Sequence, residues 1–188
     1  MLGLRHFRRT AVDLFQGDIT SFVCDGMVRV APENLAEGDC VDDSILRIGG
    51  PRIREECRRI GLCPTGHAVI TTAGDLPAKH VIHTVPPVWQ GAQINEAAHL
   101  RSAHQHCLQI AREYGLGHVA LPSIGTGAYG YPLAAAAELA LSTVRDSLTA
   151  AAPGTWRRIT FVLSNGETYQ AYQRALFSFF PELEEDRP

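Results

Sequence analysis

The 188-residue sequence predicts an α/β protein in which a largely parallel sheet carries helices on both faces. Short apolar segments alternate along the chain with longer segments whose apolar residues recur at helical spacing. When strands and helices alternate in this way, the helices connect parallel strands and cover the sheet. Hydrophobic residues make up 45% and charged residues 20% of the chain, which is ordinary for a globular protein. We therefore expect one domain over residues 1–188, with its core at about 10–180 and an acidic, solvated tail at 181–188.

Six segments are predicted to be strands, because each is short, apolar and bounded by turn residues. The segment GMVRVA ends at a proline, HVIHTV ends at two prolines, and HVALPSIG runs into a glycine-rich turn. The predicted strands are 10–17, 26–31, 67–74, 80–85, 118–125 and 157–164.

The segments between these strands predict the helices. Residues 41–61 have a mostly helical pattern that a Gly-Gly-Pro sequence interrupts at 49–51. Residues 94–115 have apolar positions at helical spacing and end at a glycine. Residues 132–148 begin with proline, which the first position of a helix tolerates, and residues 167–180 form the last helix.

Charge and hydropathy exclude some classes of partner. The net charge of −3 gives no support for bulk electrostatic attachment to nucleic acid or to an anionic membrane. No apolar run approaches the roughly 20 residues that a membrane-spanning helix needs, and the first 15 residues lack the apolar core of a signal peptide. We expect a monomeric protein without membrane or nucleic-acid partners.

Cysteine and histidine spacing gives no sign of a metal or a disulfide framework. The five cysteines are an odd number and include no C-x-x-C pair, so we expect a reduced, cytoplasmic protein. His99, His104 and His106 lie in one predicted helix, but their spacing does not put three ligands on one face. We interpret them as solvated helix residues, and we expect neither a metal nor a cofactor.

Three loops follow predicted strands, and in an α/β sheet ligands bind beyond the carboxyl ends of the strands. These loops are QGDIT at 16–20, the acidic stretch after residue 31, and LPSIGTGAYGYP at 121–132. The third loop has three glycines in six residues and is followed by a helix. Glycines let backbone amides approach a ligand closely, and amides ahead of a helix form an anion site. The loop lacks the Gly-Lys-Ser/Thr ending of a P-loop, and a tight structural turn is the alternative interpretation.

Read together, four motifs resemble the macrodomain family. They are GDIT, the loop containing VDDSI, CPTGHAVITTAGDLPAKHVIHTVPPVW, and LPSIGTGAYGYPLAAAAELAL, and they occur in the family's order between about residues 13 and 176. The resemblance implies a three-layer α/β/α sandwich with a mixed, mostly parallel sheet of about six strands. It also implies a cleft that binds ADP-ribose or ADP-ribosyl groups on protein.

The resemblance assigns roles to residues in two of these loops. Asp18 would accept hydrogen bonds from the adenine amino group, with the backbone amide of Ile19 nearby; the alternative for Asp18 is a helix cap or turn residue. The diphosphate would be wrapped by backbone amides of the glycine loop, and Tyr129 would cover the distal ribose or simply pack at the loop tip. The glycine-loop residues are Gly125, Thr126, Gly127, Ala128 and Tyr129.

The acidic loop departs from the family pattern. The family's Asn-Ala-Ala-Asn corresponds to residues 29–32, so that Pro32 replaces the asparagine that orients the distal ribose in hydrolytic members. Proline has neither a side-chain amide nor a backbone N–H. The family's glycine run corresponds to residues 37–40, where only Gly38 remains a glycine. Val41 and Asp42 are retained, and the resemblance gives Asp42 the role of activating water.

Other groups are candidates to complete this loop. Asn34 offers an amide two residues after Pro32, and Glu37 offers a second carboxylate to work with Asp42. A helix cap is the alternative role for Asp42, since acidic side chains are favoured at a helix start. At the end of the last predicted strand, where the family often stacks an aromatic residue on adenine, the chain has Ser164 and Asn165.

Two functions follow from these residues, and a third stays open. The first is an ADP-ribose-binding module that reads modified protein or holds free ligand. The second is a hydrolase that releases ADP-ribose from protein or from O-acetyl-ADP-ribose with Asp42 and an unusual partner. The third is a macrodomain fold that has moved to another nucleotide or has lost its ligand.

Overall fold

The computed structural model describes residues 3–35 and 43–181. Its strands are β1 (Leu4–Phe7), β2 (Thr10–Gln16), β3 (Gly26–Val30), β4 (Ala68–Thr72), β5 (His80–Thr84), β6 (His118–Leu121) and β7 (Arg158–Leu163). Its α-helices are α1 (Ser44–Gly49), α2 (Pro51–Ile60), α3 (Glu96–Glu113), α4 (Leu133–Ala150) and α5 (Gly166–Phe179). All six predicted strands are confirmed, and so are the predicted helical segments, apart from residues 41–42 at the start of segment 41–61, which lie outside the described residues.

The strands form one mixed sheet in the order β1-β2-β7-β6-β3-β5-β4. The five inner strands run parallel, and antiparallel strands close both edges. The prediction of about six strands is one short, because β1 was missed. Its hairpin turns through Arg8 and Arg9, which adopt left-handed backbone angles (φ 47° and 75°) without the Asn-Gly or Gly-Gly signal that marks such turns in sequences.

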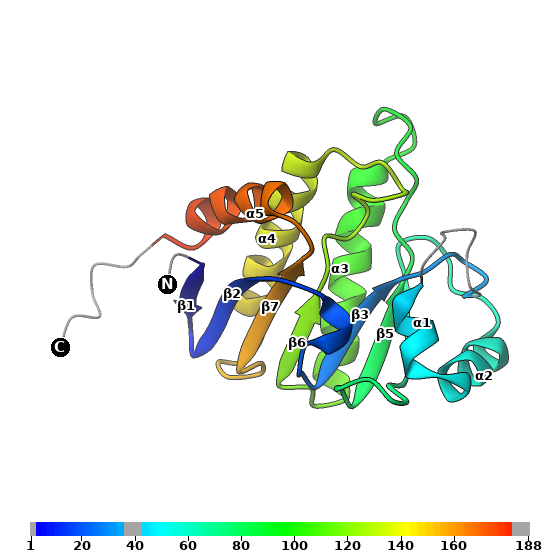
Figure 1. The fold of residues 1–188 in the computed structure, drawn as a ribbon. Helices are drawn as coiled ribbons and strands as arrows, with labels where there is room; N and C mark the ends of the chain where they lie inside the picture. Colours follow the sequence, from blue (N-terminus) through cyan, green and yellow to red (C-terminus); the bar gives the residue numbers. More distant parts are fainter. Residues whose placement is uncertain (1–2, 36–42, 182–188) are drawn as a thin grey trace.

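Two helical layers enclose the sheet, so the predicted three-layer architecture is confirmed (Figure 1). Helices α3, α4 and α5 pack against one another and form the larger core with one face of the sheet. Helices α1 and α2 cover the other face over a smaller core. Strand β3 shows the alternation directly, since Val28 belongs to the larger core and Met27 to the smaller one.

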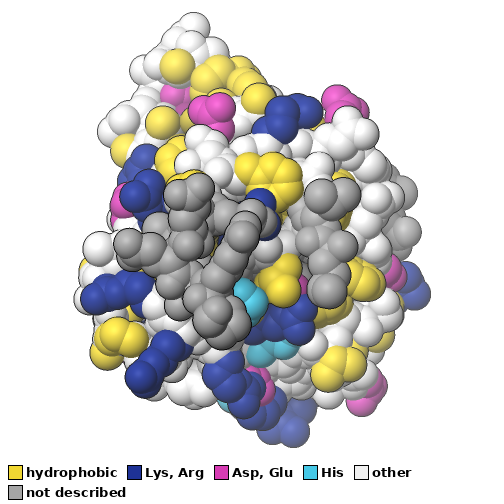
Figure 2. Space-filling model, turned by 90° about the vertical axis from the view of Figure 1, so that its left-hand side faces the viewer, with side chains coloured by type: hydrophobic (Ala, Val, Ile, Leu, Met, Phe, Trp, Pro, Cys, Tyr) yellow, Lys and Arg dark blue, Asp and Glu magenta, His cyan; other side chains and the backbone are white. Residues whose placement is uncertain are grey.

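The edge strand β1 lies on a charged face. Figure 2 views the molecule from the side of β1, and Lys and Arg side chains lie there in several separate places. Arg5 of β1 places its guanidinium 4.4 Å from the ring centre of Phe177. Charged side chains along an edge strand disfavour pairing with another chain. Within the described residues, none of the helices combines the length and the apolar character needed to cross a membrane.

Histidine placement corrects one prediction. His99 is exposed as expected, and His106 is half-buried, with Nδ1 2.9 Å from the Gly66 carbonyl. His104 is fully buried and places Nδ1 2.8 Å from the Leu100 carbonyl. The prediction of a solvated residue is wrong for His104, because α3 is buried against both the sheet and α4.

Candidate functional site

A cleft of about 640 Å³ lies at the carboxyl ends of three adjacent parallel strands. The loop after β2 contributes Gly17, Asp18 and Ile19 to its wall. The loop after β7 contributes Ser164 and Asn165, and the loop after β6 contributes Pro122, Ser123, Thr126 and Gly127. Because β2, β7 and β6 are neighbours in the sheet, their terminal loops meet at one edge. The volume is within the range of small-molecule sites.

Asp18 combines a structural role with a place on the cleft wall. Its carboxylate accepts a hydrogen bond of 2.8 Å from the Thr20 amide and caps a single turn of 3-10 helix, Ile19–Ser21. This is the turn role that the sequence left open. An ionised carboxylate has about four acceptor positions, so capping Thr20 leaves capacity for an amine donor of a ligand.

The glycine loop is built by backbone geometry. Gly125 has φ +85° and Gly130 has φ +70°, the left-handed region in which other residues are strained. The loop is closed by hydrogen bonds from the Gly130 amide to the Gly127 carbonyl and from the Tyr131 amide to the Gly125 carbonyl, both 2.9 Å long. Thr126 and Gly127 line the cleft, and a Cβ added at Gly127 would meet no atom within 4 Å. The backbone at Gly127 is therefore open to a ligand.

Ser164 and Asn165 close the cleft beside the start of α5. Asn165 caps that helix, and its side-chain oxygen accepts a 2.9 Å hydrogen bond from the Thr168 amide. Among the described residues that line the cleft there is no aromatic side chain. A base in this cleft would contact polar groups and aliphatic carbon rather than an aromatic ring.

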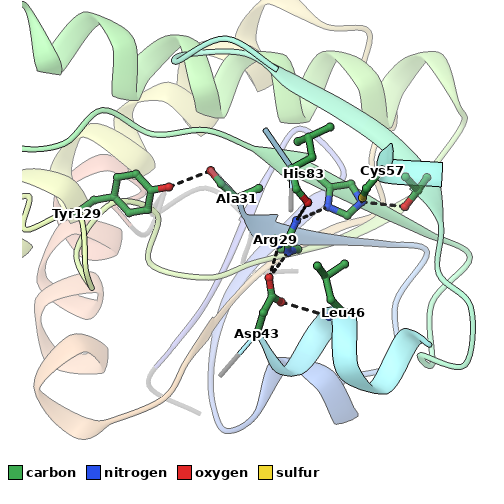
Figure 3. Close-up of polar contacts among 9 residues, drawn as sticks. Arg29, Ala31, Asp43, Leu46, Cys57, His83 and Tyr129 are labelled. Carbon is green, nitrogen blue, oxygen red and sulfur yellow. Dashed lines mark hydrogen bonds and ion pairs between the residues drawn. The ribbon is translucent and has the colours of Figure 1, made fainter. Parts of the chain in front are cut away.

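Tyr129 turns away from this cleft toward the end of β3. Its hydroxyl donates a 3.0 Å hydrogen bond to the Ala31 carbonyl (Figure 3). Its own carbonyl accepts a hydrogen bond from the Trp89 amide at 2.8 Å. Tyr129 lines a second pocket of about 580 Å³ together with Pro32, Glu33 and Asn34. The structure thus brings the two candidate residues Asn34 and Tyr129 to the same pocket.

Glu33 has a role that the sequence did not reveal. One of its carboxylate oxygens accepts hydrogen bonds from both the Thr65 amide (2.9 Å) and the Thr65 hydroxyl (2.8 Å). These hydrogen bonds hold the pKa of the Glu33 carboxyl below its usual value, so Glu33 is ionised at neutral pH. They also fasten the end of β3 to the loop before β4.

Arg29, at the position that the sequence resemblance aligns with the first asparagine of the motif, is almost fully buried on the α1 side of the sheet. It forms an ion pair with Asp43, with Nε 2.6 Å from Oδ2, and its Nη1 reaches the Leu35 carbonyl at 3.5 Å (Figure 3). Asp43 also caps α1 by accepting from the Leu46 amide at 3.2 Å. Arg29 therefore binds the described residues on both sides of segment 36–42.

His83 extends this buried network. Its Nδ1 lies 3.1 Å from Nη1 of Arg29, and its Nε2 lies 2.8 Å from the Thr71 hydroxyl. A guanidinium can only donate, so Nδ1 accepts and the ring proton sits on Nε2. Burial, together with the charge of Arg29, lowers the pKa of His83 to about 3, and the ring is neutral.

Comparison with known proteins agrees with this geometry. The sequence model of the Macro domain family matches residues 28–140, more than half of the chain. The chain belongs to the macrodomain family. An O-acetyl-ADP-ribose deacetylase of Enterobacter cloacae is 44% identical over 177 residues, which are 92% of this chain and 97% of the relative. One of Escherichia coli is 43% identical over 172 residues, covering 89% and 96%. The Oceanobacillus iheyensis macrodomain with ADP superimposes with a TM-score of 0.88 at 28% identity, covering 96% and 97%.

The described part of this macrodomain contains only some of the predicted site residues. Asp18, Ile19, Thr126, Gly127, Ser164 and Asn165 line the first cleft, and Asn34 and Tyr129 line the second pocket. Gly125 and Ala128 complete the turn between the two groups. The remaining candidates lie outside the described residues: Glu37, Gly38, Val41 and Asp42. Sequence reasoning missed the roles of Glu33 and Arg29, whose partners are distant in the chain.

Proposed function

We propose that this macrodomain binds ADP-ribose, or the ADP-ribosyl group of a modified protein, in the cleft at the ends of β2, β7 and β6. The observation that carries the proposal is the glycine loop, whose open backbone at Gly127 lies on the wall of a cleft of ligand size. Backbone amides can neutralise a diphosphate without a cationic side chain. The solved Oceanobacillus iheyensis macrodomain with ADP, which has the same fold, supports the choice of nucleotide.

The order of the lining residues supports one direction for the bound ligand. Adenine lies at the Asp18 and Asn165 end, where the Asp18 carboxylate accepts from the exocyclic amine. The diphosphate follows at Thr126 and Gly127, and the distal ribose lies toward Tyr129 and Pro32. An analogue without the amine would bind more weakly, because it leaves the Asp18 acceptor without its donor.

Gly127→Val is expected to weaken ADP-ribose binding by roughly 100-fold in calorimetry, through the loss of two charge-assisted hydrogen bonds. Gly127 lines the cleft, and because a Cβ added there meets no atom within 4 Å, the substitution leaves folding intact. Ala152→Val adds the same bulk at an exposed residue after α4 and serves as the control. Absence of binding by the wild-type protein at millimolar ADP-ribose, or wild-type affinity in Gly127→Val, would contradict the proposal.

A second candidate function is hydrolysis of O-acetyl-ADP-ribose, which the names of the curated relatives at 43–44% identity support. In this reaction water adds to the acyl carbon, the bond from that carbon to the ribose oxygen breaks, and the ribose oxygen takes a proton. The products are ADP-ribose and acetate. Asp42 would accept the proton of the water, with Asn34 or Glu37 in place of the amide that Pro32 cannot supply.

Asp42→Asn is expected to slow the release of acetate from O-acetyl-ADP-ribose by about 100-fold or more, the usual contribution of a general base. Chromatography of the nucleotide products measures the release. Asp146→Asn makes the same change on an exposed part of α4 and controls for the loss of one charge. Release at the wild-type rate by Asp42→Asn would remove Asp42 from the mechanism.

We also propose a compartment and an oligomeric state for this protein. The protein acts as a monomer in the cytoplasm, on free ADP-ribosyl compounds or on ADP-ribosylated protein. The four cysteines within the described residues, which are buried free thiols, support a reducing compartment. Size-exclusion chromatography with light scattering tests the oligomeric state.

A further inference from the structure

The second pocket is separate from the nucleotide cleft and lies near it along the glycine loop. Gly127 lines the cleft and Tyr129 lines the second pocket, and two residues of chain span at most about 7 Å. The Tyr129 hydroxyl bonds to the Ala31 carbonyl, next to Pro32 on the pocket wall. In the proposed binding mode the distal ribose lies toward Tyr129 and Pro32, so the second pocket lies at the distal-ribose end of the ligand.

The walls of this pocket are mainly apolar and are held in place by hydrogen bonds. Leu62 and Val88 line it with side chains that are 63% and 54% exposed, beside Pro86 and the Tyr129 ring. The four main-chain segments that form the walls are tied together in pairs. The Cys63 amide donates to the Glu33 carbonyl at 2.7 Å, and the Trp89 amide donates to the Tyr129 carbonyl at 2.8 Å. The pocket is thus formed before any ligand arrives.

We propose that the second pocket holds the hydrocarbon chain of an acyl group carried by the distal ribose, and that the protein prefers O-acyl-ADP-ribose with chains longer than acetyl. This rests on the proposed binding of ADP-ribose in the cleft. At about 30 Å³ for a group the size of water, the three heavy atoms of an acetyl group fill about 90 Å³. The pocket of about 580 Å³ has room for several further methylenes.

An acyl chain fits these walls better than a peptide does. A buried peptide requires partners for each N–H and C=O group. Pro32 and Pro86 have no N–H to offer, and both donors of Thr65 are already bonded to Glu33. The Glu33 carboxylate also disfavours an acidic segment. An uncharged hydrocarbon chain needs none of these partners and gains from the apolar surface of Leu62 and Val88.

The test uses calorimetry with ADP-ribose and with analogues in which an amide replaces the ester, so that no hydrolysis occurs during titration. The butyryl analogue is expected to bind the wild-type protein about tenfold more tightly than the acetyl analogue, from two buried methylenes. Val88→Glu and Leu62→Glu should abolish this difference. Neither residue lines the nucleotide cleft, so the affinity for free ADP-ribose should stay within about twofold of wild type.

Val23→Glu is the matched control, because Val23 is 74% exposed and precedes the amino end of β3, at the end of the sheet opposite the carboxyl ends where the pocket lies. It should keep the full preference for butyryl. Equal affinity of the wild-type protein for both analogues, or a preference that survives in both variants, overturns the proposal while ADP-ribose still binds. If an ADP-ribosylated peptide binds more tightly than free ADP-ribose, both variants lose this gain, and acyl chain length has no effect, then the pocket binds peptide. That outcome also overturns the proposal. If the wild-type protein binds none of these ligands, the proposed binding of ADP-ribose is contradicted instead.

Discussion

Between pH 8 and pH 5 the protein is expected to lose roughly 4 kcal/mol of its free energy of unfolding. Burial lowers the pKa of His83 to about 3 and that of His104 to about 4, from an ordinary value of 6.5. Between the folded-state pKa and 6.5, each of these histidines is protonated in the unfolded chain but not in the folded protein. The free energy of unfolding therefore falls as the pH falls. Each histidine contributes roughly 2 kcal/mol by pH 5, a large share of the 5–15 kcal/mol typical of a domain.

The pH range separates this effect from that of the carboxylates. Unfolded Asp and Glu side chains titrate near pH 4, so they contribute little above pH 5. His118 adds to the loss, because burial lowers its pKa as well, although it is only half-buried. Urea unfolding at pH 8, 7, 6 and 5 measures the change.

His104→Leu is expected to reduce this pH-dependent loss by roughly 2 kcal/mol, because it removes one buried titrating group and keeps an apolar side chain in α3. Among the described residues the Nε2 atom of His104 is buried without a hydrogen-bond partner, so its loss costs no polar contact at that atom. His99→Leu makes the same change at an exposed residue of the same helix and should leave the slope as in wild type. An equally steep decline in His104→Leu would show that another group causes the loss.

Arg29→Met is expected to lower the free energy of unfolding by about 3 kcal/mol at pH 7.5. Removal of one member of a buried ion pair leaves the other charge without compensation, which costs about 3–5 kcal/mol when the pair is fully buried. The lower figure applies here, because the side chain of Asp43 remains 16% exposed. The hydrogen bonds to the Leu35 carbonyl and to His83 are lost as well.

A double-mutant cycle isolates the pair. Asp43→Asn can still cap α1, since asparagine is as good a cap as aspartate. When Asp43→Asn is added to Arg29→Met, the free energy of unfolding should rise by about 1–2 kcal/mol, because the uncompensated charge is removed. Arg59→Met removes an arginine from an exposed pair with Glu55 and should cost less than about 0.5 kcal/mol. Additive effects in the cycle, or equal losses in Arg29→Met and Arg59→Met, would refute the role of burial.

Local sequence patterns predicted most of the elements that build the site. The strand 80–85 ends at two prolines and the strand 118–125 at a glycine turn, and the structure has β5 at His80–Thr84 and β6 at His118–Leu121. Gly125 was recognisable because its left-handed backbone angle needs a residue without Cβ. These features depend on neighbouring residues, so the sequence displays them directly. Strand β1 was not predicted, because Arg8 and Arg9 form its hairpin turn without a glycine.

By itself the sequence determined that this is a macrodomain with a glycine-rich loop at 121–132, a carboxylate at Asp18 and a proline at position 32. The tertiary structure alone decided that Arg29 is a buried ion-pair partner of Asp43 and a neighbour of His83, 54 residues away in the chain. It also decided that Glu33 binds Thr65 and that Leu62, Val88 and Tyr129 share one pocket. Such contacts join residues from different strands and loops, and their energy depends on burial that arises only when the sheet and both helical layers have assembled.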